Sequence, residues 1–173
     1  VDGIEDVRTS TVSVFNGPAP TIRQFDTSEE ETEFVSNWLA DLQGDGYQPH
    51  EIALIVRSDK EIDRAIAAIE RTEIPYRVLD SYIQLVHGNA AICTMRLAKG
   101  LEFRAVVVMA CDDEIIPSQE RIEAVVDNAD LEEVYETERH LLYVACTRAR
   151  DSLLVTSGDV PTEFLDDLLS KPK

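Results

Sequence analysis

Phosphate-binding loops are absent from this sequence. Neither GxxxxGK[ST] nor GxGxxG occurs among its 173 residues, and its seven glycines are dispersed. An enzyme that hydrolyses ATP on its own needs a loop of this kind to hold the phosphates. We therefore expect no ATP hydrolysis by this chain in isolation.

Cysteine and long apolar runs are also scarce. The three cysteines, Cys93, Cys111 and Cys146, form no CxxC pair, which argues against a disulfide framework and against a structural zinc site. Each lies in an apolar segment, so we expect three buried thiols in a protein of the reducing cytoplasm. No run approaches the roughly 20 apolar residues that a membrane helix needs.

The N-terminus has neither the basic start nor the apolar stretch of a signal peptide. It begins at Val1 rather than Met, which suggests a processed chain or a piece of a longer protein. The length suits one domain over residues 1–173, with residues 1–20 as an extended lead-in.

Positive charge is deficient. Sixteen Lys and Arg face 34 Asp and Glu, for a formal net charge of −18. A domain that bound duplex DNA by itself would carry a basic surface, because neutralising phosphates supplies most of the affinity. Either the chain binds no nucleic acid, or it makes a few local contacts while a partner domain supplies the rest. Composition by itself favours the first possibility.

Apolar runs alternate with helical patterns along the chain. Continuous apolar runs such as residues 52–56 and 105–110 are typical of strands buried on both faces of a parallel sheet. We therefore predict an α/β fold, with a mainly parallel sheet covered by helices on both faces. Strands are predicted at residues 21–25, 51–57, 75–79, 91–95, 105–110 and 152–156, and helices at 28–43, 59–69, 131–148 and 161–169.

An acidic stretch follows the apolar run at 105–110. Asp112, Asp113 and Glu114 resemble the acids that hold Mg²⁺ at a strand end in nucleotide hydrolases. Without a phosphate loop, a magnesium ligand at this position has nothing to bridge to. We expect these acids to face solvent and residues 111–130 to form a long surface loop, and we predict no metal site.

Polar side chains gather around one glycine after a predicted strand. Thr94, Arg96, Lys99 and Glu102 surround Gly100. Ligands of open α/β sheets bind beyond the carboxyl ends of the strands, and glycine lets the backbone approach a ligand closely. Arg96 and Lys99 can meet phosphates, and Glu102 can accept a hydrogen bond from a ribose hydroxyl. The alternative is a capped helix start with no ligand.

Residues 138–150 place three arginines around the C-terminal half of a predicted helix. Cations at this end interact favourably with the helix dipole, which is one explanation for them. The other is that Arg148, just beyond a buried stretch, is held rigidly to bind a phosphate. A guanidinium fork suits that role better than the ammonium group of lysine.

These two segments resemble motifs of a known family. Residues 94–103, TMRLAKGLEF, are similar to motif V of UvrD/Rep-type superfamily-one DNA helicases, T-x-H-x-A-K-G-L-E-F. Residues 138–149, ERHLLYVACTRA, are similar to their motif VI, E-R-x-L-L-Y-V-A-x-T-R-A. The order of the motifs, their spacing and the apolar strand between them also match. Over roughly residues 29–156 the chain resembles the second, C-terminal motor domain of these helicases.

The resemblance implies a RecA-like domain that closes on ATP and Mg²⁺, which are held mainly by an N-terminal motor domain. Arg148 would then be the arginine finger at the γ-phosphate. Gly100 and Glu102 would contact the ribose side of ATP, and Arg139 and Tyr143 would support the finger.

The resemblance also implies DNA as the substrate. Thr94, Arg96 and Lys99 would contact single-stranded or partly duplex DNA in a cleft shared with the first domain, in a motor of the 3′→5′ class. A short grip on one strand is compatible with an acidic outer surface.

Three departures from the family pattern stand out. Arg96 replaces the usual His of motif V. The upstream glutamine-arginine motif IV is missing, and we expect it to precede Val1. Only about fourteen residues separate Asp80 from Thr94, where UvrD and Rep carry a large inserted accessory subdomain. Translocation along a strand is therefore a safer expectation than processive unwinding.

A second hypothesis belongs to another class of protein. A non-catalytic helicase-like module could dock on a transcription or DNA repair complex, with the acidic residues 111–130 as its docking face. Arg148 and Glu102 favour the motor, because a pure docking domain needs neither.

Overall fold

The computed structural model describes residues 19–169. All but the last two residues of the predicted 1–20 lead-in lie outside this range. None of the helices within it is long and apolar enough to cross a membrane.

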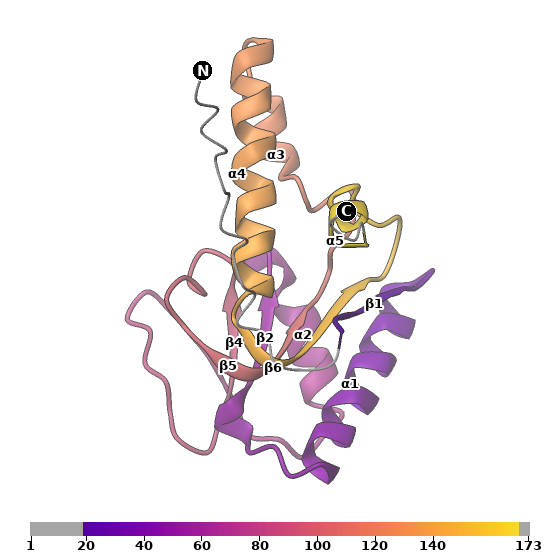
Figure 1. Ribbon diagram of the computed structural model, residues 1–173, viewed down its shortest axis with the longest axis vertical. Helices are drawn as coiled ribbons and strands as arrows, with labels where there is room; N and C mark the ends of the chain where they lie inside the picture. Colours follow the sequence, from indigo (N-terminus) through magenta and orange to yellow (C-terminus); the bar gives the residue numbers. More distant parts are fainter. Residues whose placement is uncertain (1–18, 170–173) are drawn as a thin grey trace, which may run out of the picture.

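Six strands form one parallel sheet in the order β1-β6-β5-β2-β4-β3 (Figure 1). This confirms the predicted parallel α/β arrangement. The strands are β1 (Thr21–Gln24), β2 (Ile52–Val56), β3 (Tyr76–Val78), β4 (Ala90–Thr94), β5 (Phe103–Val108) and β6 (Ala149–Ser157). The helices are α1 (Ser28–Gly44), α2 (Ile62–Ile69), α3 (Gln119–Glu123), α4 (Asn128–Cys146) and α5 (Phe164–Leu169), with short 3₁₀ turns η1 (Pro49–Glu51) and η2 (Asp59–Glu61).

The sheet separates two apolar cores. Alternate residues of β2 point to opposite faces, as the geometry of a strand requires. Ala53 and Ile55 belong to the core beneath α4 and α5, whereas Leu54 belongs to the core beneath α1 and α2. Both faces are therefore covered, which explains why β2 is apolar throughout instead of alternating with polar residues.

Helix α4 carries the second family-like segment and extends well beyond the sheet. Leu142 and Ala145, in its C-terminal half, are buried against the sheet. Its N-terminal half rises away from the body of the domain, with α3 nearby (Figure 1). The end of α4 that meets the sheet therefore has a fixed position.

The prediction of a surface loop over residues 111–130 was wrong in part. The segment contains α3 and the start of α4, where the side chain of Asp127 caps the helix by accepting a hydrogen bond from the N–H of Asp130 at 2.9 Å. Cys111 and Ile116 are fully buried. The acidic composition led to the wrong prediction. A few buried apolar residues are enough to attach a mostly polar segment to the core.

Candidate functional site

The motif V-like segment runs from one end of the sheet to the other. Thr94 is the last residue of β4, and its carbonyl oxygen accepts hydrogen bonds from Leu97 and Ala98. Glu102 immediately precedes β5, which is parallel to β4. The segment therefore starts at the carboxyl ends of the strands and finishes at their amino ends, so its polar residues do not form one cluster.

Arg148 lies at the amino ends of β5 and β6, beside the second half of that segment. Its Nη1 donates to the carbonyl oxygen of Leu101 at 3.2 Å, and its Nε donates to the carbonyl oxygen of Val144 at 3.1 Å. Nη2 donates to Oγ1 of Thr147 at 3.2 Å, and the backbone of Arg148 accepts a hydrogen bond from the N–H of Phe103 at 2.9 Å. The guanidinium is thus held in place and is only partly buried.

The hydrogen bonds of Arg148 leave donors to spare. A guanidinium has five N–H groups, and three are used as described above. For the others, one on each Nη, the structure gives no partner among residues 19–169. An anionic oxygen can accept from this pair, as a phosphate does from an arginine fork.

Gly100 and Glu102 flank Leu101, whose carbonyl oxygen accepts the hydrogen bond from Arg148. Gly100 has a φ of +83°, a left-handed conformation that favours glycine, and a Cβ there would meet nothing within 4 Å. Both residues are exposed, as is Lys99. The turn thus presents an open backbone at Gly100 and the exposed carboxylate of Glu102, whose charge also interacts with Arg150.

Arg96 lies at the opposite end of the sheet, where it lines a pocket of about 360 Å³. The pocket lies beyond the carboxyl ends of β2 and β4. Thr94 is 8% exposed, so its side chain is nearly buried, whereas Arg96 is exposed. The residues that line the pocket are Arg57, Ser58, Asp59, Lys60, Glu61, Arg96, Glu114, Ile115, Ser118, Gln119, Glu120 and Arg121.

Behind this pocket, one fully buried carboxylate binds two arginines. Glu138 of α4 accepts hydrogen bonds from Arg57 at 2.7 Å (Nε) and 2.5 Å (Nη2), from Arg121 at 3.0 Å and from the Ser118 N–H at 3.1 Å. Burial by itself would raise the pKa of Glu138. The hydrogen bonds and charge of Arg57, reinforced by Arg121 and Ser118, outweigh burial, so this pKa lies below its ordinary value.

Arg139 and Tyr143 lie in a groove between α4 and α5 of about 410 Å³. Arg139 donates to Asp167 at 2.9 Å, and its guanidinium carbon lies 4.9 Å from the ring centroid of Phe164. Tyr143 is 57% exposed. The hydrogen bonds of the Arg148 side chain among the described residues involve neither side chain, and the contacts of Arg139 instead attach α5 to α4.

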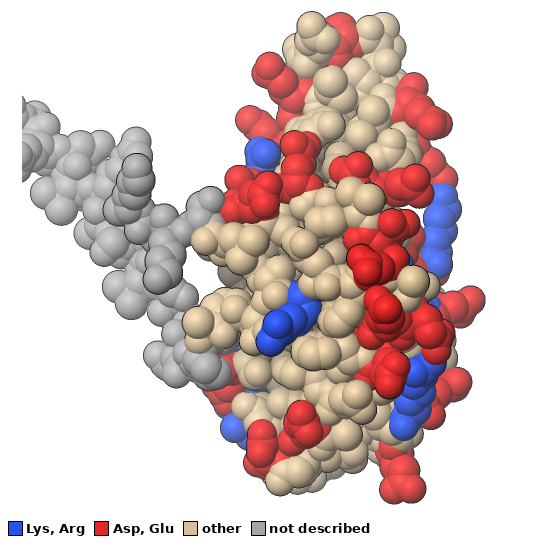
Figure 2. Space-filling model, turned by 90° about the vertical axis from the view of Figure 1, so that its right-hand side faces the viewer, with Lys and Arg blue, Asp and Glu red and all other residues tan. Residues whose placement is uncertain are grey.

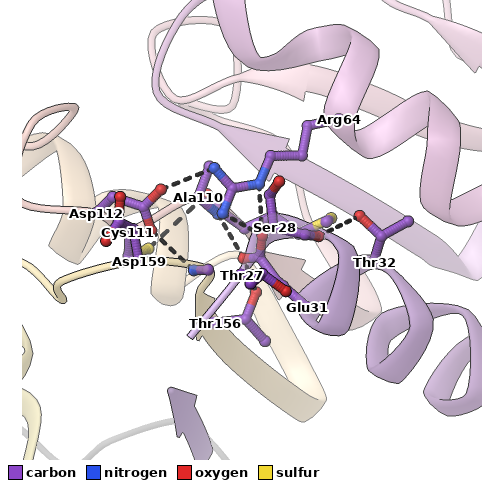
Figure 3. Close-up of polar contacts among 12 residues, drawn as sticks. Thr27, Ser28, Glu31, Thr32, Arg64, Ala110, Cys111, Asp112, Thr156 and Asp159 are labelled. Atoms are coloured by element: carbon purple, nitrogen blue, oxygen red, sulfur yellow. Dashed lines mark hydrogen bonds and ion pairs between the residues drawn. The ribbon is translucent and has the colours of Figure 1, made fainter. Parts of the chain in front are cut away.

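The prediction that Asp112 faces solvent was wrong, whereas Asp113 and Glu114 are exposed. Asp112 is 5% exposed, accepts from Arg64 Nη1 at 2.7 Å and accepts from the Gly158 N–H at 2.9 Å (Figure 3). Arg64 also donates to the fully buried Glu31 at 2.6 Å. An acid just beyond a strand is therefore used here to join α1, α2 and β6.

Sequence reasoning missed both buried carboxylates, although a signal exists. Glu138 lies at helical spacing from the buried Val134 and Leu142, and Glu31 lies at helical spacing from the buried Val35. A charge within an apolar helical stripe indicates a buried partner, because an unpaired buried charge is costly. The identity of that partner depends on the tertiary fold.

Acidic side chains predominate on the face of the molecule drawn in Figure 2. Within residues 19–169, no group of three His, Cys, Asp or Glu side chains is placed to hold a metal ion.

The all-parallel sheet covered by helices on both faces has the arrangement of an α/β domain of the RecA-like class. Its fold is similar to that of the C-terminal domain of a possible DNA helicase from Lactobacillus plantarum. That comparison gives a TM-score of 0.63 and 22% identity, and it covers 88% of this chain and 84% of the other.

Residues 83–159 match the UvrD-like helicase C-terminal domain family. The chain is 29% identical over 140 residues to the ATP-dependent DNA helicase Rep of Buchnera aphidicola subsp. Schizaphis graminum, covering 80% of this chain and 18% of Rep. It is 32% identical over 92 residues to the ATP-dependent DNA helicase PcrA of Staphylococcus epidermidis, covering 47% of this chain and 12% of PcrA. Over these residues the chain is similar to the C-terminal part of UvrD/Rep-type helicases, and it spans under a fifth of the length of these relatives.

Proposed function

We propose that this chain is the C-terminal motor domain of an ATP-dependent DNA helicase or translocase of the 3′→5′ class. In this proposal it supplies an arginine finger and single-strand contacts to an ATP cleft shared with an N-terminal RecA-like domain. The observation that carries the proposal is the position of Arg148, held against the carbonyl oxygen of Leu101 beside the Gly100 turn. Two segments 47 residues apart in the sequence thereby meet at one surface.

Arg148 contributes fixed positive charge to this cleft. Its hydrogen bonds to Val144 and Leu101 orient the guanidinium before any ligand arrives, which lowers the cost of reorganisation during the reaction. Its two free N–H groups would bind the γ-phosphate, and the exposed Glu102 would accept from a ribose hydroxyl. ATP and Mg²⁺ would be held mainly by the other domain, where Mg²⁺ would neutralise charge on the phosphates.

Single-stranded DNA would lie at the other end of the sheet. Arg96 is exposed at the pocket beyond β2 and β4, and Thr94 and Lys99 flank it in the chain. Because Thr94 is nearly buried, we assign the direct phosphate contact to Arg96 and, at the exposed turn, to Lys99. The two ends of one segment would then serve DNA and ATP respectively.

The test measures single-strand-stimulated ATP hydrolysis by the full-length protein. Arg148→Ala should lower kcat by about 10³–10⁵, the range typical of an arginine finger. Arg150→Ala is the matched control: it removes the same charge two residues away, from a side chain that donates to Asp151 at 3.1 Å. Equal turnover in wild type and Arg148→Ala would eliminate the finger, whereas an equal loss in both variants would indicate a general charge effect.

A non-catalytic module that docks on a transcription or repair complex is the second candidate. The arm formed by α3 and the N-terminal half of α4 favours it, because Val126, between α3 and α4, is 91% exposed. A docking module predicts that Val126→Asp abolishes partner capture while Arg148→Ala changes nothing. A motor predicts the opposite pattern in the ATPase assay.

A further inference from the structure

Glu138 connects three separate parts of the fold through one buried carboxylate. It lies on α4, Arg57 directly follows β2, and Arg121 lies on α3. Its side chain is 0% exposed and accepts four hydrogen bonds, two of them from Arg57. Any movement of Arg57 or Arg121 therefore changes the contacts of α4.

The residues that hydrogen-bond to Glu138 also line the pocket beyond β2 and β4, together with Arg96. Arg57, Ser118 and Arg121 all line it. The side chain of Arg121 is 36% exposed, so a ligand in the pocket can reach it. An anionic oxygen bound there would compete with Glu138 for the same guanidinium, because both are acceptors for its N–H groups.

Helix α4 links this carboxylate to Arg148. Eight residues of roughly 1.5 Å rise place Glu138 about 12 Å from Cys146, the last residue of α4, and Arg148 follows two residues later. The Nε of Arg148 donates to the carbonyl oxygen of Val144, on the last turn of α4. The guanidinium is thus attached to the same rigid helix that Glu138 anchors.

From these contacts we infer that Glu138 is a positioning residue. When a phosphate of the DNA strand binds in the pocket lined by Arg96, Glu138 transmits this binding to Arg148 and so changes how Arg148 is placed at ATP. This inference rests on the proposed function and adds to it the residue through which the two sites communicate. Loss of Glu138 should reduce the coupling between the sites more than it reduces either affinity.

The experiment measures coupling directly in the full-length protein. The affinity for a single-stranded oligodeoxythymidylate is determined by fluorescence anisotropy with and without a non-hydrolysable ATP analogue. The ratio of the two affinities is the coupling factor, typically about 5–150-fold for linked sites. Glu138→Gln should bring this factor close to 1. A purely structural role would lower stability and leave the factor unchanged.

Glu31→Gln is the matched control. Glu31 is also 0% exposed and paired with an arginine, but its partners are Arg64, Thr156 and the Ala110 N–H, away from the pocket. The Glu31→Gln protein should keep the wild-type coupling factor although it loses stability. If Glu138→Gln fails to fold, Arg121→Gln removes one contact of the carboxylate from a partly exposed position and should lower the factor at least several-fold.

The outcomes separate the two proposals. A wild-type factor in both Glu138→Gln and Arg121→Gln, or an equal reduction in Glu31→Gln, overturns the role of Glu138. If Arg148→Ala still abolishes strand-stimulated hydrolysis, the motor function survives that result. Undiminished hydrolysis in Arg148→Ala overturns the arginine finger itself. Absence of any coupling in the wild type overturns the inference as well.

Discussion

Arg57 and Glu138 are 81 residues apart in the sequence and form a two-point ion pair in the interior, with Nε–Oε2 and Nη2–Oε1 distances of 2.7 and 2.5 Å. The pair joins the carboxyl end of β2 to the middle of α4. Because both side chains are less than 10% exposed, neither charge can regain water if its partner is removed.

Replacing one partner should therefore destabilise the domain strongly. Glu138→Gln is expected to cost about 3–5 kcal/mol of the free energy of unfolding at pH 7, the usual penalty for an uncompensated buried charge. Urea unfolding monitored by circular dichroism measures this. A cost below roughly 1 kcal/mol would mean that water reaches the pair.

The same pair should make stability depend on pH. Folding lowers the pKa of Glu138 below its ordinary value of 4.5. Its contribution is therefore complete well above pH 4.5 and is lost as the pH falls through the lowered value. The difference in unfolding free energy between wild type and Glu138→Gln should shrink from pH 7 towards pH 3, and a constant difference would contradict this.

Gly158 should not tolerate a side chain. A Cβ there would lie 2.3 Å from Nη2 of Arg64 and 2.7 Å from Cα of Ser28, and the latter is backbone that cannot move aside cheaply. Gly158→Ala should lower stability by about 1–3 kcal/mol, the cost typical of overpacking. Gly44→Ala, at the end of α1 with nothing within 4 Å of the new Cβ, should be neutral or stabilising by up to about 1 kcal/mol.

The three thiols should be unreactive in the folded protein. Burial raises the pKa of Cys93 and of Cys146 to about 12, and it raises the pKa of Cys111 well above its ordinary value. Since the thiolate is the nucleophile, iodoacetamide at pH 8 should modify none of them until denaturant is added. Mass spectrometry counts the adducts, and rapid native labelling at any of the three would show that the structure around that cysteine opens locally.

Arg96 should contribute to DNA affinity through phosphate charge. Arg96→Ala is expected to weaken single-strand binding by the full-length protein and to lower the slope of log affinity against log salt by about 1. Arg77→Ala serves as the control, because Arg77 is exposed on the edge strand β3 and is in register with Ala91, near the amino end of β4, whereas Arg96 follows the carboxyl end of β4. Identical slopes for both variants and the wild type would remove Arg96 from the binding surface.

The sequence by itself determined the class of fold and the two segments that matter. Uninterrupted apolar runs such as β2 predict strands buried on both faces, because no polar residue is tolerated on either side. The start of α1 was also readable: the helix begins at Ser28 as predicted, and the side chain of Thr27 caps it by accepting a hydrogen bond from the N–H of Glu30. These signals depend only on residues that are neighbours in the sequence, so they can be read without the tertiary structure.

Only the tertiary structure decided which polar residues meet. It placed Arg148 beside Leu101 and put Arg96 at the opposite end of the sheet, although Arg96 and Leu101 belong to one short segment. It also turned Asp112 inward to Arg64. The sequence around a charged residue does not identify its partner. Ion pairs and hydrogen bonds form between groups that lie close together in three dimensions. The order of the strands in the sheet determines which groups these are.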